Sequence, residues 1–226
     1  MRLKDLLAYK QIIVQCHDNP DADAIASGYG VYFYLKQQGK EVRLVYGGNN
    51  VIRKGNLVIM VNELEIPIEH VRNVEKEEPA ELVVTVDCQC GEGNVSLYPA
   101  KEYAVIDHHR VERKLPFLSR VESGLGACST LVWMMLCEEG IDINTDEDLA
   151  TALYYGLYKD TGNFDTLYQE YGEDVHFLMI NLTDNATDTV RKVKAFVEQQ
   201  GYSFPVYYDT ELNVALTYYI PSIPRT

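Results

Sequence analysis

The sequence has few of the groups that support disulfide bonding, membrane insertion or a zinc ribbon. Its 226 residues include only five cysteines, and the one close pair, Cys88 and Cys90, has no matching second pair. An odd number of cysteines within apolar runs is typical of reduced thiols in a cytoplasmic protein. No apolar stretch approaches the roughly 20 residues needed to cross a bilayer, and MRLKDLLAYK lacks the apolar core of a signal peptide. We therefore expect a cytoplasmic protein that has no membrane partner.

Basic residues are also scarce. The chain has 20 Lys and Arg against 34 Asp and Glu, which gives a formal net charge of -14. Such a surface repels polyanions on average, so a long nucleic acid is not an expected partner. A small phosphorylated molecule or a short oligonucleotide is compatible with this charge if bound metal ions supply positive charge locally.

Short apolar segments alternate with helical segments over most of the chain. Strands are expected at Gln11–Cys16, Glu41–Tyr46, Asn56–Val61, Leu82–Val86 and Tyr103–Ile106, and helices at Ala22–Gln38, Gly126–Glu139 and Asp146–Lys159. This alternation predicts an α/β fold, in which a doubly wound, mostly parallel sheet is flanked by helices.

The C-terminal part has a different pattern. Helices are expected at about Gly172–Asn181 and Thr187–Gln200, and a small hairpin would pair Val206–Tyr208 with Leu212–Tyr219. We divide the chain into a domain of residues 1–185 and an appendage of residues 186–226, a helix plus a hairpin. This division suits the length of the chain. A homodimer is compatible with the sequence.

Acidic and histidine side chains follow three of the predicted strands. The ends of these strands and of one helix carry His17, Asp21, Asp23, Asp87, Asp107, His108, His109 and Asp160. In open α/β sheets, ligands bind beyond the carboxyl ends of the strands, so these residues should converge. Imidazole and carboxylate without thiolate suit manganese or a similar divalent ion. Two such ions about 3.5–4 Å apart can clamp the attacking and leaving oxygens of an in-line displacement.

The predicted centre has two Mn²⁺ ions, with Mg²⁺ or Co²⁺ as alternatives. Asp87 stands alone at its strand end and is the natural carboxylate to bridge them. Four aspartates would balance the charge of two divalent ions, so an anionic substrate needs further donors. Arg110, His109 and the amides that open a helix near Ser129 are candidates for this role.

Each motif alone has a structural explanation. An Asp-x-Asp after proline is often a turn and a helix N-cap, and Asp87 could cap a turn. Paired histidines at a strand end are more often structural than catalytic. Their coincidence at several strand and helix ends favours a metal centre.

Four segments resemble the motifs of the DHH phosphoesterase superfamily. They are HDNPDADAIASG, VTVDC, VIDHH and GLYKDTGNF, in that order, over about residues 11–165. The resemblance implies that His17, Asp21 and Asp87 hold one manganese ion. It implies that Asp23, Asp87, His108 and Asp160 hold the other, with Asp87 shared. His109 would face the substrate phosphate, and Asp107 would orient a ligand histidine.

The resemblance also bears on the substrate. No Gly-Gly-His substrate-binding motif follows Asp160, which favours a non-catalytic module, but the segment Gly124–Trp133 is similar to one in the nanoRNase-type branch of the superfamily and favours that branch over the pyrophosphatases. We therefore expect a manganese-dependent phosphoesterase for short oligonucleotides or nucleotide phosphates, with His109, Asp107 and Arg110 as catalytic residues. Hydrolysis of inorganic pyrophosphate or polyphosphate is the first alternative. A module that binds metal or nucleotide without catalysis is the second.

Overall fold

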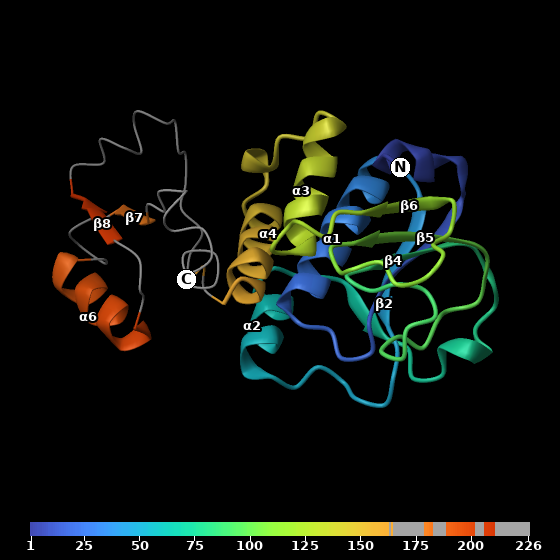
Figure 1. The fold of residues 1–226 in the computed structure, drawn as a ribbon, viewed down its shortest axis with the longest axis horizontal. Coiled ribbons are helices and arrows are strands. Elements are labelled where there is room, and N and C mark those ends of the chain that lie inside the picture. Colours follow the sequence, from blue (N-terminus) through green and yellow to red (C-terminus); the bar gives the residue numbers. More distant parts are fainter. Residues whose placement is uncertain (163, 165–178, 183–188, 202–205, 211–226) are drawn as a thin grey trace. The chain divides into compact units, whose positions relative to one another are not determined.

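The structure is a computed structural model that describes residues 1–162, 164, 179–182, 189–201 and 206–210 (Figure 1). The chain forms two compact units, Met1–Asp160 and Thr161–Thr226, and each is described by itself. The domain boundary expected at residues 185 and 186 lies outside the described residues and stays a prediction.

The first unit is built on a six-stranded parallel sheet. Its strands are β1 (Gln11–Cys16), β2 (Glu41–Tyr46), β3 (Ile68–His70), β4 (Ala80–Val86), β5 (Ala100–Asp107) and β6 (Leu118–Val121). The order is β3-β2-β1-β4-β5-β6, and every neighbouring pair is parallel. This order is that of a doubly wound sheet, which confirms the predicted α/β fold.

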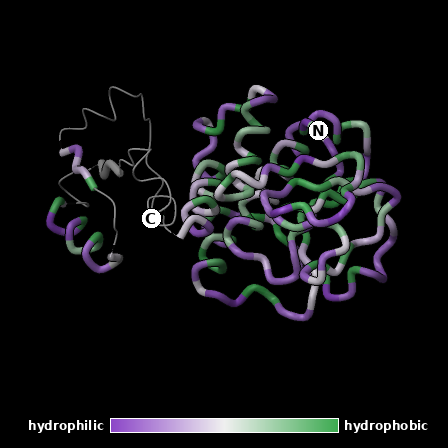
Figure 2. Tube along the Cα trace, viewed as in Figure 1, coloured by the Kyte–Doolittle hydropathy of each residue, from purple (hydrophilic) through white to green (hydrophobic). Residues whose placement is uncertain are grey.

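Helices cover one face of this sheet. They are α1 (Ala22–Gln37), α2 (Gly55–Glu63), α3 (Cys128–Glu138) and α4 (Glu147–Asp160), and α1, α3 and α4 lie side by side (Figure 1). Val14 and Val84 of the sheet belong to one buried apolar cluster with Ile25 of α1 and Leu131 of α3. Figure 2 shows hydrophobic residues along the strands and hydrophilic residues in the outer loops. Burial on both sides explains why the central strands read as continuous apolar runs.

The opposite face is covered by irregular segments. Ile13, Val45 and Val83 point to this side and form a second buried cluster with Val74 and Tyr98. Val74 belongs to the short 3-10 helix η2 (Val74–Lys76), and Tyr98 lies in the connection between β4 and β5. Two further 3-10 helices are η1 (Leu3–Ala8) and η3 (Ile143–Thr145).

One expected strand is wrong. Asn56–Val61 lies within helix α2, where Leu57 and Met60 are buried three residues apart while Ile59 is 62% exposed. A short apolar run has no clear period, so a helix and a strand are hard to distinguish there. The edge strands β3 and β6 have only three and four residues and no apolar run to indicate them.

The second unit contains the parallel pair β7 (Met179–Leu182) and β8 (Val206–Asp209), joined through helix α6 (Val190–Gln200). The helix expected at Thr187–Gln200 is confirmed in the part that is described. It begins after the N-cap Thr189 and ends at Gly201, whose φ is 68°. A helical crossover of this kind is what a parallel pair requires.

Two expectations for this unit change. The helix expected to end at Asn181 is wrong over Met179–Asn181, which is strand, and its earlier residues lie outside the described part. The Val206–Tyr208 strand is confirmed, but it pairs with β7. Its expected partner, Leu212–Tyr219, is not described. None of the described helices has the length and apolar composition needed to cross a membrane.

Two glycines allow α1 to approach its neighbours closely. A Cβ atom at Gly28 would lie 2.6 Å from Leu44 Cδ1, and one at Gly30 would lie 2.6 Å from Val132 Cγ1. Both distances are too short for carbon atoms. The short distances from α1 to the sheet and to α3 therefore require glycine, which has no side chain, at these two positions.

We expect Gly30→Ala to lower the free energy of unfolding by about 1–3 kcal/mol, because the added methyl overpacks the α1–α3 contact. Gly55→Ala is the control, since a Cβ there meets nothing within 4 Å. Urea unfolding of both variants is the measurement. Equal stability of the two variants would contradict the close packing.

Candidate metal centre

The candidate site lies at the carboxyl ends of the central strands. The chain leaves β1 towards β2 on one side of the sheet, and leaves β4 towards β5 on the other. A crevice forms between two strands whose connections diverge in this way. His17 directly follows β1, Asp87 directly follows β4, and Asp107 ends β5. The topology therefore places these three residues at one edge, as the sequence predicted.

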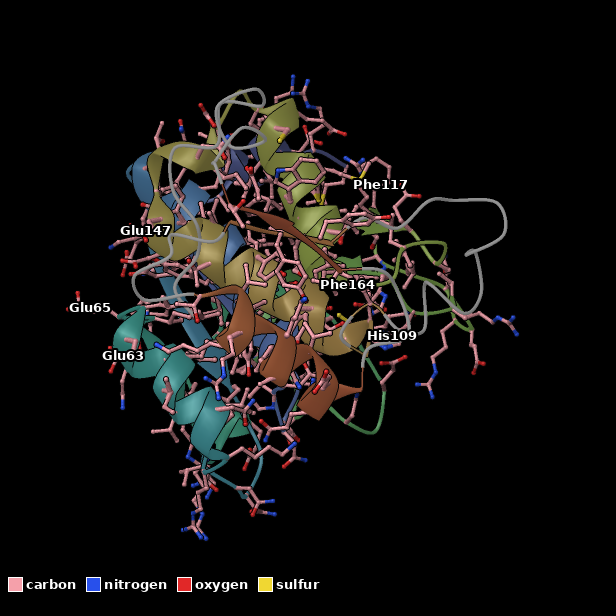
Figure 3. All side chains as sticks on the ribbon, turned by 90° about the vertical axis from the view of Figure 1, so that its left-hand side faces the viewer. Glu63, Glu65, His109, Phe117, Glu147 and Phe164 are labelled. Atoms are coloured by element: carbon pink, nitrogen blue, oxygen red, sulfur yellow. The ribbon has the colours of Figure 1, made fainter. Side chains whose placement is uncertain are left out.

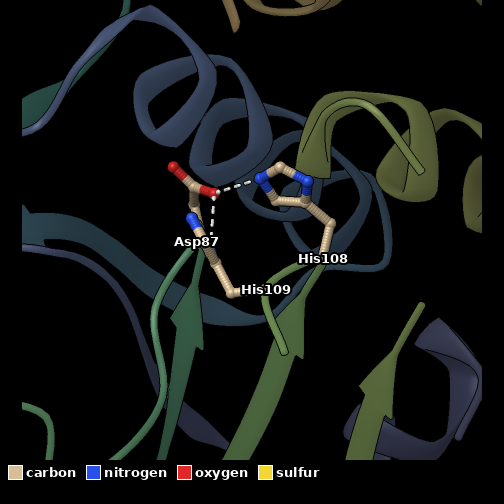
Figure 4. Close-up of side chains that lie close together, drawn as sticks. All are labelled: Asp87, His108 and His109. Atoms are coloured by element: carbon tan, nitrogen blue, oxygen red, sulfur yellow. Dashed lines mark ion pairs between the residues drawn. The ribbon is translucent and has the colours of Figure 1, made fainter. Parts of the chain in front are cut away.

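Asp87 occupies the centre of this edge. It has a positive φ of 57°, its amide donates to the Ile106 carbonyl at 3.0 Å, and it is 4% exposed. Figure 4 shows Asp87 Oδ1 facing two rings, with His108 Nε2 at 3.3 Å and His109 Nδ1 at 3.8 Å. On the other side, Oδ2 lies 3.9 Å from His17 Nε2. Within the described chain, Oδ1 is a buried oxygen without a hydrogen bond.

Asp21 and Asp23 differ in their surroundings. Asp21 is the N-cap of α1, and its Oδ1 accepts from the amides of Asp23 and Ala24 at 3.0 Å. Asp23 is buried and reaches the first turn of α3, where its two oxygens accept from the amides of Cys128 at 2.6 Å and Ser129 at 2.9 Å. The positive end of the α3 dipole faces this carboxylate. The Ser129 amide, which we expected to assist a substrate, is bonded to Asp23 instead.

His108 is held by its inner ring nitrogen. Its Nδ1 lies 3.0 Å from the Leu125 carbonyl, so this nitrogen donates and Nε2 is left to face the carboxylates. The Nε2 atom lies 3.4 Å from Asp160 Oδ2 and 3.9 Å from Asp23 Oδ2. Asp160 is the last residue of α4. Its carboxylate therefore reaches the site from a helix end, as expected.

Three groups of side chains have ligand atoms close enough to hold a metal ion. Within each group, these atoms lie within 4.8 Å of one another. The groups are His17, Asp21 and Asp87; Asp23, His108 and Asp160; and Asp87, His108 and His109. All six residues expected as ligands are present, and Asp87 belongs to two groups.

Asp107 contacts the ring of His109, the histidine expected to face the substrate, and not the ring of an expected ligand histidine. Its fully buried carboxylate accepts from His109 Nδ1 at 2.8 Å through Oδ1, and from Gln89 Nε2 at 2.8 Å through Oδ2. The ring of His108, the expected ligand, is held by Leu125. The His109 ring is 56% exposed and is labelled in Figure 3. Arg110 is also exposed, and its carbonyl accepts from Gln89.

Burial and close charges shift the pKa values of these groups. Burial raises the pKa of Asp87 to about 7. Burial alone would lower the pKa of His108, but the Asp87 carboxylate outweighs it and raises that pKa to about 9. Burial also raises the pKa of Asp23 and Asp160 and lowers that of His17. Protons therefore bind more tightly to Asp23, Asp87, His108 and Asp160 than in the unfolded chain, and less tightly to His17.

Gln89 and Leu125 were not found by sequence reasoning. Gln89 is 2% exposed and bonds to Asp107, and Leu125 contributes only a carbonyl. A lone amide in a loop and a main-chain oxygen carry no recognisable pattern, so no sequence signal marks them.

After chelator treatment, the stability of the protein should fall as the pH rises from 7 to 9. The folded-state pKa of His108 is raised from 6.5 to about 9, so the folded chain keeps a proton that the unfolded chain has lost. This stabilisation is complete below pH 6.5 and disappears as the pH passes 9. Thermal unfolding should show a weaker pH dependence for His108→Asn than for wild type. Parallel curves would contradict the shift.

Comparison with known proteins identifies relatives for the first unit. The model of the "DHH family, N-terminal domain" matches residues 11–157. A probable manganese-dependent inorganic pyrophosphatase of Streptococcus thermophilus is 31% identical over 156 residues, which cover 67% of this chain and 48% of the relative. An uncharacterised protein of Methanocaldococcus jannaschii is 29% identical over 153 residues, or 68% of this chain and 31% of the relative.

A solved structure has the same fold. The exopolyphosphatase-related protein from Bacteroides fragilis superposes with a TM-score of 0.57 at 20% identity, covering 76% of this chain and 55% of the other. The chain thus spans about half the length or less of the curated relatives named above. The family model covers most of the first unit and all but one of the six expected ligands. The chain belongs to the DHH family.

Proposed function

We propose that this chain is a manganese-dependent phosphoesterase that hydrolyses phosphodiester or phosphomonoester bonds in short oligonucleotides or nucleotide phosphates. The observation that carries the proposal is the position of Asp87 among the ligand groups. It joins His17 and Asp21 on one side and faces His108 on the other, next to Asp23 and Asp160. In this arrangement one carboxylate would be shared by two ions.

The residues fit a divalent cation. Asp87 Oδ1 is buried without a hydrogen bond among the described residues, and such an oxygen is costly to bury. A cation would offset this cost. The six ligands offer imidazole nitrogens and carboxylate oxygens without thiolate, which suits manganese. The streptococcal relative is named as manganese-dependent.

When bound, divalent ions polarise phosphoryl oxygens and lower the pKa of a coordinated water. The chain's own residues would orient the substrate. Asp107 accepts from His109 Nδ1, which leaves the exposed edge of the ring free to face a phosphoryl oxygen. Arg110, the next residue in the chain, is exposed, and a guanidinium can pair with two such oxygens. His109 and Arg110 would therefore stabilise negative charge on the substrate.

Inorganic pyrophosphate is the second candidate substrate. The similarity to the streptococcal pyrophosphatase over 67% of this chain favours it. Against it stands the charge of the chain, because a compact polyphosphate needs several lysines and arginines, and acidic residues outnumber basic ones by 34 to 20.

A cytoplasmic location and a homodimer stay predictions.

Asp87→Asn should lower manganese-stimulated hydrolysis at least about 100-fold, because it removes the charge of the shared ligand. The variant should also bind less Mn²⁺ in a calorimetric titration. Asp142→Asn is the matched control. Asp142 caps η3 away from the ligand groups, and asparagine is an equally good cap. Undiminished turnover in Asp87→Asn would refute the proposed role.

A substrate panel with added Mn²⁺ separates the candidates. We expect phosphate or nucleotide release from a dinucleotide to exceed phosphate release from pyrophosphate, with no release in the presence of a chelator. Faster release from pyrophosphate would favour the second candidate. Tight Mn²⁺ binding without turnover of any substrate would favour a non-catalytic binding module.

A further inference from the structure

The loop that follows Asp87 contacts the segment that follows β5 through one buried side chain. Gln89 is 2% exposed, and its Nε2 donates to Asp107 Oδ2 at 2.8 Å and to the Arg110 carbonyl at 3.4 Å. The main-chain amide of Gln89 donates to Glu92 Oε2 at 3.1 Å, which fixes the backbone from which this side chain extends. The side-chain amide of Gln89 therefore contacts both the Asp107 carboxylate and the main chain at Arg110.

Asp107 passes this contact on to His109. Its Oδ1 accepts from His109 Nδ1 at 2.8 Å and from the His108 amide at 2.9 Å, while its Oδ2 accepts from Gln89. The whole carboxylate is inaccessible to solvent. Loss of the Gln89 donor would leave Oδ2 buried without that partner, which is costly. The carboxylate would then turn or draw in water, and its bond to His109 would change.

We propose that Gln89 is a positioning residue for the substrate-facing side of the site. Through Asp107 it fixes the plane of the His109 ring, and through the Arg110 carbonyl it fixes the chain that carries the Arg110 guanidinium. Its role in turnover rests on the proposed function, because His109 and Arg110 contact a substrate only if the protein is a phosphoesterase. Its role in orienting the His109 ring is independent of the proposed function.

A second buried glutamine provides a comparison within the same protein. Gln15 of β1 is fully buried, donates to the Ser96 carbonyl at 2.7 Å and accepts from the Tyr98 amide at 2.9 Å. It thus holds the far end of the β4–β5 connection, and only through main-chain atoms. Gln89 differs because its acceptor is a carboxylate that is itself bonded to a histidine ring. Loss of either amide weakens the connection, but only Gln89 should affect His109.

The direct test measures the His109 ring by NMR in chelator-treated protein. Gln89→Met keeps the length of the side chain and removes the donor, and Gln15→Met is the matched control. We expect the His109 ring nitrogen and proton signals to shift or broaden in Gln89→Met and to stay in place in Gln15→Met. An unchanged His109 signal in folded Gln89→Met overturns the proposal, as does an equal change in Gln15→Met.

Gln89→Asn covers the case in which Gln89→Met does not fold. It keeps an amide on a shorter side chain and buries no new apolar group, so its reach to Asp107 is lost without a hydrophobic change. The same His109 shift is expected. Because this readout needs no substrate, failure of the proposed function would leave it intact.

Kinetics provides a second test with any substrate that the protein hydrolyses. Gln89→Met should lower kcat about tenfold, similar to the loss of other residues that orient a site from behind. In a His109→Ala background, the same change should lower kcat less than about threefold, because only the route through Arg110 is left. An equal loss in both backgrounds would overturn a role that acts through His109.

Discussion

Burying a carboxylate oxygen without a hydrogen bond costs free energy, and Asp87 does this at the centre of the sheet edge. The groups around it are further carboxylates and three imidazoles, which come from three other segments of the chain. Without a cation, protons relieve this cost, because burial raises the pKa of Asp87 and the Asp87 carboxylate raises that of His108. The same charge is what a divalent ion would neutralise. Metal binding and proton binding should therefore compete for one place in the molecule.

The buried central strands and the packed helices of the first unit hold the residues of the site in place. His17 and Asp87 directly follow β1 and β4, the two strands at the middle of the sheet, and both strands are buried on both faces. Asp23 lies on α1, which packs against both α3 and α4. A Cβ atom at Gly156 of α4 would come within 3.1 Å of Asp23 Oδ1. The contact that packs α4 against α1 therefore also positions Asp23, a candidate ligand.

The sequence was sufficient to predict what depends on local pattern. Apolar strands followed at once by Asp or His marked the sheet edge, and His17, Asp87 and His108 meet there as predicted. Contacts made in three dimensions could not be read in this way. The Ser129 amide is bonded to Asp23, more than 100 residues earlier in the chain. Likewise, nothing near Gln89 in the sequence shows that its amide reaches Asp107. Residue type identifies candidates, and packing decides which atoms meet.

The backbone at Asp87 limits how this position can vary as the sequence drifts. Its φ of 57° lies in the left-handed region, which glycine, asparagine and aspartate occupy readily and most other residues do not. Of these three, only aspartate carries a charge. A homologous chain that keeps this turn therefore has two options at this position. It retains aspartate, or it changes to glycine or asparagine and loses one unit of negative charge at the centre of the cluster. Glutamate, the usual conservative exchange, is disfavoured by the main chain before its chemistry matters.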